Sequence, residues 1–188
     1  MKKLLIFVAL LLNLPAIALA SAPDDRLGAG EVIVTPTTVA GFFMPRLTVQ
    51  FVVDAAPEKV WKIVSDCSNY PKSMPRVKKT REVLRQGNRT HCEMTIDMPF
   101  PFEDLQDVSA HNAAVTPGRW HDTFTLLTGD YVKKEGSWTL TPFDDQNKRT
   151  RVVYVGHSVP ITRVPDGMMR RGQMSAMRDM VDLIRKQF

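Results

Sequence analysis

The sequence predicts an α+β protein of the helix-grip type, in which a curved antiparallel sheet wraps around a long C-terminal helix. Three observations support this fold class. Two strand patterns precede a short amphipathic helix pattern, several strand patterns separated by turn residues follow, and a long amphipathic helix pattern ends the chain. The 188 residues contain no internal repeat and no low-complexity tract, so one domain with a substantial core is expected.

The first 20 residues, MKKLLIFVALLLNLPAIALA, have the three parts of a secretory signal peptide: two lysines, an apolar run and a small-x-small ending. An uncleaved membrane anchor is the alternative. Asn13 and Pro15 interrupt the apolar run, which is already shorter than the roughly 20 residues that span a bilayer. We therefore predict cleavage before Ser21 and a periplasmic or secreted protein.

The predicted organisation is a signal peptide over residues 1–20, a flexible N-terminal segment over residues 21–30 and a folded domain over residues 31–188. Loss of the two signal-peptide lysines lowers the formal net charge from +5 to about +3. This charge is too mild to indicate nucleic acid as a partner. The four histidines are isolated from one another and there is no CxxC motif, so the sequence predicts no metal site and no cofactor.

The N-terminal elements are two predicted strands and a helix. Residues 31–39 are rich in β-branched side chains, and residues 46–54 alternate apolar with polar side chains. A helix over residues 57–66 follows, because Pro57 suits a first helical turn and apolar side chains recur at helical spacing. This helix must end before Pro71, where the sequence SNYP is typical of a turn.

Strand patterns dominate the middle of the chain. Residues 77–85 and 90–98 form a predicted hairpin around the turn QGNR. In its second arm every other residue from Cys92 to Met98 is apolar, so this face is expected to line a core. Four more strands, each bounded by Gly, Pro, Asp or Asn, are predicted over residues 105–115, 119–127, 136–141 and 151–158.

The last predicted element is a helix over residues 165–187, whose apolar face must cover the sheet. Five of the ten methionines lie in this helix, which fits either ordinary core packing or the adaptable wall of a lipid-binding cavity. Gln173 is the polar exception on the apolar face. We expect its amide to meet a polar group of a ligand, or else water or a backbone group. The apolar face consists of Met169, Ala176, Met177, Met180, Leu183 and Ile184.

The segment APEKVWKIVSDCSNYPKSMPRVKKTREV, from Ala56 to Val83, resembles the opening signature of the START-like superfamily, also called SRPBCC. This superfamily includes polyketide cyclase/dehydrase and lipid-transport proteins and is related to coenzyme Q-binding proteins. The resemblance continues through MPFPFEDLQDV, GDYVKKEGSWTLTP and TRVVYVGHSVP into the last helix. The matching positions of the opening signature are Ala56-Pro57, Val60-Trp61, Asp66, Tyr70-Pro71 and Pro75-Arg76-Val77.

The resemblance implies a deep apolar cavity between the sheet and the C-terminal helix. It further implies a carrier whose partner is a lipid, a quinone or another hydrophobic molecule, and which acts outside the cytoplasm if the signal peptide is used. A cyclase or dehydratase in the same cavity, and an accessory module for a membrane quinone, are the alternatives, because a fold does not fix a function. The resemblance assigns to the cavity and its mouth Trp61, Tyr70, Met74, Met94, Met98, Phe100, Trp138, Met169, Met177 and Met180. Gln173 joins these predicted ligand-binding residues because of its position on the apolar face of the last helix.

Catalytic groups are sparse in the sequence. His121 and Asp122 are neighbours in a predicted strand, so their side chains point to opposite faces and do not form an acid-base pair. The acidic group Glu103, Asp104 and Asp107 is predicted to be a solvated turn and not a carboxylate pair for acid-base chemistry. Gln173 is then the only polar side chain expected inside the cavity, which favours a binding protein over an enzyme.

Cys67 and Cys92 are predicted to be free thiols. A disulfide needs Cα atoms within about 7 Å, and the hairpin geometry places Cys92 far from the segment that carries Cys67. The predicted oxidising compartment favours a disulfide, so the two arguments conflict. No base or orienting group accompanies Cys67 in the sequence, and we expect no nucleophilic role for it.

A basic cluster follows the first helix, with only Glu82 nearby to offset it. Such a cluster fits transient contact with an anionic membrane surface, which attracts each basic residue by about 1 kcal/mol. A solvated strand face explains the cluster equally well. Its members are Lys72, Arg76, Lys78, Lys79 and Arg81.

Overall fold

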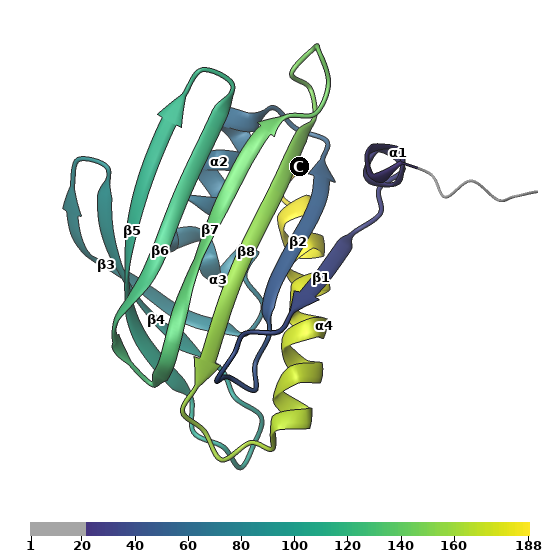
Figure 1. Cartoon of the computed structure of the whole chain (residues 1–188). Coiled ribbons are helices and arrows are strands. Elements are labelled where there is room, and N and C mark those ends of the chain that lie inside the picture. The colour runs from purple at the N-terminus through teal and green to yellow at the C-terminus, as the bar shows by residue number, and fades with distance from the viewer. Residues whose placement is uncertain (1–21) are drawn as a thin grey trace, which may run out of the picture.

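The computed structural model describes residues 22–188, which form one eight-stranded antiparallel sheet and its covering helices (Figure 1). The predicted signal peptide and its cleavage site lie outside the described residues. The strands are β1 (Ile33–Thr37), β2 (Arg46–Val53), β3 (Val77–Gln86), β4 (Arg89–Ile96), β5 (Leu105–Thr116), β6 (Arg119–Gly129), β7 (Tyr131–Pro142) and β8 (Thr150–Pro160). The helices are α1 (Pro23–Gly28), α2 (Pro57–Val64), α3 (Tyr70–Ser73) and α4 (Asp166–Arg185), with a 3-10 turn η1 (Cys67–Asn69).

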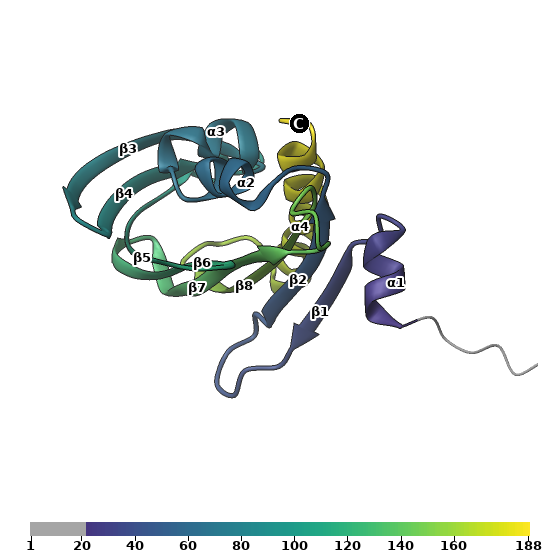
Figure 2. The ribbon, with the colours of Figure 1, turned by 90° about the horizontal axis from the view of Figure 1, so that it is seen from above.

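The sheet has the strand order β1-β2-β8-β7-β6-β5-β4-β3 and is strongly curved. Seen from above, β3 and β4 fold over β5 to β8, and α4 closes the open side of the curve (Figure 2). The helices α2 and α3 connect β2 to β3 and lie on the side of β3 and β4 (Figure 2). This arrangement confirms the predicted helix-grip fold.

The main hydrophobic core lies between the concave face of the sheet, α2 and the C-terminal half of α4. Strands contribute alternate residues to it, as their period-two pattern requires. The helix α4 contributes one face of its last turns. The largest contributions come from Val49, Phe51, Val53, Trp138, Leu140, Met180, Val181 and Ile184, all of which are fully buried.

The segment after α2 forms two short helical turns where the sequence predicted only an open turn. The backbone N–H of Ser68 donates to Asp66 Oδ1 at 2.9 Å and so caps η1. Pro71 lies in the first turn of α3, where its missing N–H leaves no hydrogen bond unmade. Pro71, which the sequence pattern predicts as the limit of α2, therefore also lies in the first turn of α3.

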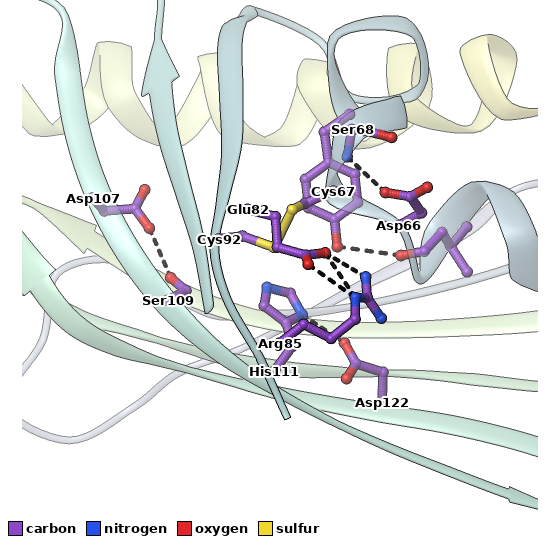
Figure 3. Close-up of a disulfide and its surroundings, with 12 residues drawn as sticks. Asp66, Cys67, Ser68, Glu82, Arg85, Cys92, Asp107, Ser109, His111 and Asp122 are labelled. Carbon is purple, nitrogen blue, oxygen red and sulfur yellow. Dashed lines mark hydrogen bonds and ion pairs between the residues drawn. A yellow bond between two sulfur atoms is a disulfide. The ribbon is translucent and has the colours of Figure 1, made fainter. Parts of the chain in front are cut away.

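A disulfide joins Cys67 in η1 to Cys92 in β4 (Figure 3). Their Cα atoms lie 6.2 Å apart, within the range of a bridged pair. The prediction of two free thiols is wrong, because it placed Cys67 beside the start of β3. The helical turns after α2 instead pack over the middle of the hairpin, where Glu82 pairs with Cys92. The bond ties the covering helices to the sheet.

Residues 23–28 form the helix α1 and are not a flexible linker as predicted. Leu27 is completely buried, and Asp24 forms an ion pair with Arg151 of β8 at 2.7 Å. The guanidinium groups of Arg149 and Arg151 also lie over the ring of Phe143, beside Gly28. The single apolar residue in a polar segment gave too weak a periodic signal to predict this helix.

Strand β7 begins at Tyr131, well before the predicted start at residue 136. Its early part carries the charged residues Lys133, Lys134 and Glu135, which hide the alternation of a strand. Lys133 and Glu135 form an ion pair on the outer face at 2.7 Å. Lys134 points to the concave face, with consequences for the cavity described below.

None of the helices between residues 22 and 188 is both long enough and apolar enough to cross a membrane.

Replacement of both cysteines by serine, C67S/C92S, is expected to lower the free energy of unfolding by about 3 kcal/mol. The bond links positions 25 residues apart and so restricts the unfolded chain. Urea unfolding of the oxidised protein, compared with the double variant and with the reduced protein, measures this loss. Alkylation of two thiols in unreduced, unfolded protein would contradict the disulfide.

Candidate ligand-binding cavity

A cavity of about 340 Å³ lies between the concave face of the sheet, α3 and the N-terminal half of α4. This volume is at the lower end of the ~300–1,000 Å³ that small-molecule sites occupy. Most of the lining is apolar. The cavity is lined by all but two of the residues predicted to bind a ligand, namely Tyr70, Met74, Met94, Met98, Trp138, Met169, Gln173, Met177 and Met180.

The two other predicted residues, Trp61 and Phe100, do not line the cavity. Trp61 is part of α2 and packs against the main core. Phe100 is 96% exposed in the loop between β4 and β5, because β4 ends at Ile96 and the alternation of a strand no longer applies. It follows Pro99, which lines the cavity, so Phe100 lies near the rim and outside the wall.

The cavity has a closed end and an open end. At the closed end the lining residues Tyr70, Phe124 and Trp138 are buried. At the open end Pro99 and Met168 line the cavity and are exposed to solvent. These residues place an opening of the cavity between the β4–β5 loop and the start of α4.

Aromatic rings form the floor of the cavity. The ring of Tyr154 lies 4.6 Å from that of Trp138 and 6.1 Å from that of Phe124, measured between centroids. Phe124 packs directly over Gly136 of β7, where an added Cβ would overlap its ring. Position 136 requires glycine because the Phe124 ring approaches its backbone this closely. The floor is apolar and suits a ring system or an alkyl chain.

A buried polar stripe crosses the concave face and corrects the sequence analysis in two ways. Asp107, Ser109 and His111 are alternate residues of β5, and all three face inward and are buried. Asp107 is therefore not part of a solvated turn, unlike Glu103 and Asp104, which precede the strand. Gln173 is also not the only polar side chain in the cavity, because His111 and Lys134 line it as well.

Lys134 and Asp107 form a buried ion pair at one end of the stripe. The Nζ atom of Lys134 donates to Asp107 Oδ2 at 2.6 Å, and Ser109 Oγ donates to Asp107 Oδ1 at 2.7 Å. Burial lowers the pKa of Lys134, and the Asp107 carboxylate offsets part of this shift. The ion pair has enough partners to leave neither charge isolated.

His111 and Asp122 form a second buried pair, close to the disulfide (Figure 3). His111 Nδ1 lies 2.7 Å from Asp122 Oδ2. As predicted, His121 does not pair with its neighbour Asp122, and its Nδ1 instead contacts Thr139 Oγ1 at 2.9 Å. The sequence contains one feature from which the His111–Asp122 pair could have been predicted. The Pro117-Gly118 turn sets the β5–β6 register, which brings position 122 diagonally across from position 111.

Tyr70 covers the closed end above His111, with ring centroids 6.2 Å apart. Its hydroxyl donates to the backbone oxygen of Val64 at 3.2 Å. Burial raises the pKa of Tyr70, and it raises the pKa of Tyr154 to about 12. Both phenols are therefore neutral at physiological pH and serve as apolar walls with a polar tip.

Two cavity-lining residues keep a buried polar atom without a hydrogen-bond partner among residues 22–188. These atoms are His111 Nε2 and Gln173 Oε1. Asp122 Oδ1, next to His111, is also buried without a partner. Buried polar groups are normally paired, so the two atoms of the cavity lining are available to a ligand or to water. In the same range, no group of three or more His, Cys, Asp or Glu is arranged to hold a metal ion.

The basic cluster after α2 is partly neutralised by acidic partners that sequence order did not reveal. Lys78 contacts Asp97 at 2.7 Å and Asp104 at 2.8 Å, and Arg81 contacts Glu93 at 2.8 Å. Glu82, the predicted partner, pairs instead with Arg85. The acidic residues come from β4 and the loop that follows it.

Sequence comparison assigns the chain to a protein family. Residues 44–188 match the family described as polyketide cyclase / dehydrase and lipid transport. The chain belongs to this family, as the START-like resemblance implied. Its structure is that of a hydrophobic ligand-binding domain of the START/SRPBCC type. No curated protein sequence matches the chain.

Solved structures share the fold at low sequence identity. The STAR-related lipid transfer protein from Xanthomonas axonopodis is 17% identical with a TM-score of 0.73, and the match covers 83% of this chain and 92% of that one. Human StAR-related lipid transfer protein 5 is 13% identical with a TM-score of 0.72, over 86% and 83% of the chains. The aromatase/cyclase Zhui from Streptomyces sp. R1128 is 16% identical with a TM-score of 0.57, over 75% and 88%. The fold is thus shared by lipid-transfer proteins and enzymes.

The substitution Lys134→Met is expected to lower the free energy of unfolding by about 3–5 kcal/mol, because it leaves the Asp107 carboxylate buried without its counter-charge. The double variant K134M/D107L removes both charges and is expected to recover most of this loss. Urea unfolding measures both. Lys133→Met, at the more exposed neighbouring position, is the control, with an expected change below about 1 kcal/mol. Equal losses in the single and double variants would contradict the coupling of the two charges.

Proposed function

We propose that the protein binds one hydrophobic small molecule or lipid in its cavity and carries it outside the cytoplasm. The observation that carries this proposal is the cavity itself, which is closed at one end, has an aromatic floor and opens beside α4. Lining methionines from β4 and α4 can adapt to the shape of a bulky apolar ligand. The bound molecule would be shielded from water except at the mouth.

The size of the cavity favours a ligand with one alkyl chain or a compact ring system. A volume of about 340 Å³ leaves little room for a lipid with two long chains. A quinone head group or a polycyclic molecule would pack against the aromatic floor formed by Phe124, Trp138 and Tyr154. An accessory module for a membrane quinone would use the same cavity but, unlike a carrier, would yield no extractable ligand.

Two independent features support transport outside the cytoplasm. The N-terminal residues have the composition of a secretory signal peptide. The disulfide between Cys67 and Cys92 is typical of proteins that fold in an oxidising compartment.

Ligand exchange would take place while the mouth of the cavity contacts a lipid surface. Large apolar side chains near the mouth are exposed, with Phe100 at 96%, Ile161 at 60% and Met168 at 46%. The exposed residues Arg163 and Arg170 flank them in sequence and would attract anionic lipid. We therefore propose this surface, and not the basic cluster after α2, as the main contact with the membrane. Acidic partners offset part of the charge of that cluster.

The second candidate function is that of a cyclase or dehydratase acting in the same cavity. The observation in its favour is the buried His111–Asp122 pair, since a histidine oriented by a carboxylate is a common general base. Turnover of an aromatic or polyketide substrate that is lost in His111→Phe would support it. A purified protein that retains its ligand chemically unchanged would favour the carrier.

A hydrophobic molecule is expected to remain bound, near one per chain, in protein taken from its native envelope. Ala176→Trp places a large side chain in the cavity and is expected to reduce this occupancy at least about tenfold, since the ligand and the indole would occupy the same volume. Native mass spectrometry measures the occupancy. Ser175→Trp is the matched control, because Ser175 is the adjacent, exposed residue of α4 and does not line the cavity. Equal occupancy in the two variants would contradict binding in this cavity.

Export is expected to remove the first 20 residues. The intact mass of protein isolated from its native source should correspond to a chain that begins at Ser21, with the disulfide formed. A chain with its first 20 residues intact, located in the cytoplasm, would contradict the proposed location without affecting the proposal of ligand binding.

A further inference from the structure

We propose that His111 Nε2 accepts a hydrogen bond from a hydroxyl group of the bound molecule, so that the cavity selects neutral alcohols or phenols with an apolar body. This inference rests on the proposed function and names the chemical class of its ligand. It assigns the polar end of the ligand to the closed end of the cavity.

The tautomer of the neutral imidazole follows from its partner. Asp122 is a carboxylate, which only accepts hydrogen bonds, so the proton between the two groups belongs to His111 Nδ1. In the neutral ring Nε2 then carries a lone pair and acts as an acceptor. Figure 3 shows the ring with one nitrogen turned to Asp122 and the other turned away from it.

This acceptor is buried and has no partner. His111 is 7% exposed and lines the cavity, and Nε2 makes no hydrogen bond to any of residues 22–188. The rings of Tyr70 and Phe124 flank the imidazole, with centroids 6.2 Å and 5.7 Å away. A buried acceptor between apolar rings costs free energy until a donor reaches it.

The neighbouring polar groups do not meet this need. The Tyr70 hydroxyl donates to Val64, and both Ser109 Oγ and Lys134 Nζ donate to Asp107. These donors therefore have acceptors of their own. No donor of residues 22–188 reaches His111 Nε2, so the donor is a ligand or water inside the cavity.

The same surroundings select against an anionic ligand group at this end. Asp122 Oδ1 is buried beside His111 without a partner, so a ligand carboxylate would meet a like charge in a region of low dielectric. A hydroxyl carries no charge and supplies one donor. Gln173 Oε1, the other unpartnered atom of the lining, is also an acceptor and is compatible with a second hydroxyl.

The test compares two probes of similar shape, 2-naphthol and 2-methoxynaphthalene, of which only the first donates a hydrogen bond. Purified protein freed of co-purifying ligand should bind 2-naphthol ~3- to 10-fold more tightly, as expected for one buried hydrogen bond. His111→Phe should abolish this ratio and leave the affinity for 2-methoxynaphthalene nearly unchanged. His91→Phe is the matched control, since His91 lies on the adjacent strand and does not line the cavity, and it should keep the ratio.

A second measurement does not depend on a folded variant. The ¹⁵N resonance of His111 Nε2 in the unmodified protein should shift when 2-naphthol binds and stay in place when 2-methoxynaphthalene binds. Equal affinities for the two probes, or a ratio that persists in His111→Phe, would overturn this inference and leave the proposed function standing. Failure of both probes to bind the emptied protein would overturn the proposed function and the inference with it.

Discussion

The packing of α4 against the concave face of the sheet is the interaction on which the cavity depends. The last turns of this helix bury Met180, Val181 and Ile184 in the main core, and Arg185 donates to the backbone oxygen of Val52 at 3.0 Å. The first turns have no such support. Their inward residues, from Met168 to Met177, face the cavity. One helix is thus fixed at its C-terminal end and forms a ligand-facing wall at its other end.

The opposite wall is held by a covalent bond and by a small second core around it, which consists of Cys67, Tyr70, Cys92 and Met94. The turns η1 and α3 are short and contribute few buried residues, so their position over the sheet depends on the disulfide to β4 and on Tyr70. This wall carries Tyr70 and Met74 to the closed end of the cavity. Because both walls are fixed in this way, they do not pack onto the eight-stranded sheet, and an apolar space stays open between them.

The fold was predictable because each long element carries its own periodic signal. Strand alternation and the apolar stripe of α4 identified the sheet and the helix, and residue resemblance then gave the family. Elements with mixed signals were missed or shortened: α1 has one buried apolar residue, and the start of β7 is masked by charged residues. The disulfide was missed because it depends on how a short helical segment folds back over the hairpin, which no local pattern describes.

The apolar lining was more predictable than the polar one. Alternation in β4 and the stripe in α4 placed Met94, Met177 and Met180 correctly. Asp107, His111 and Lys134 were not predicted, since charged residues in a sequence are normally assigned to solvent. Their burial is possible because other strands supply a partner for each: Asp122 of the adjacent β6 pairs with His111, and Lys134 of β7 pairs with Asp107 of β5, two strands away. Both pairings depend on a strand register that must be known to within one residue.

The cavity is proposed to be a binding site that a ligand fills in the native protein. A crystal structure of protein isolated from its native envelope tests this most directly. We expect continuous electron density for one non-protein molecule between Trp138 and the first turns of α4, with a polar atom within hydrogen-bond distance of His111 Nε2. A cavity that contains only ordered water, or one closed by the first turns of α4 packing onto the sheet, would contradict the account.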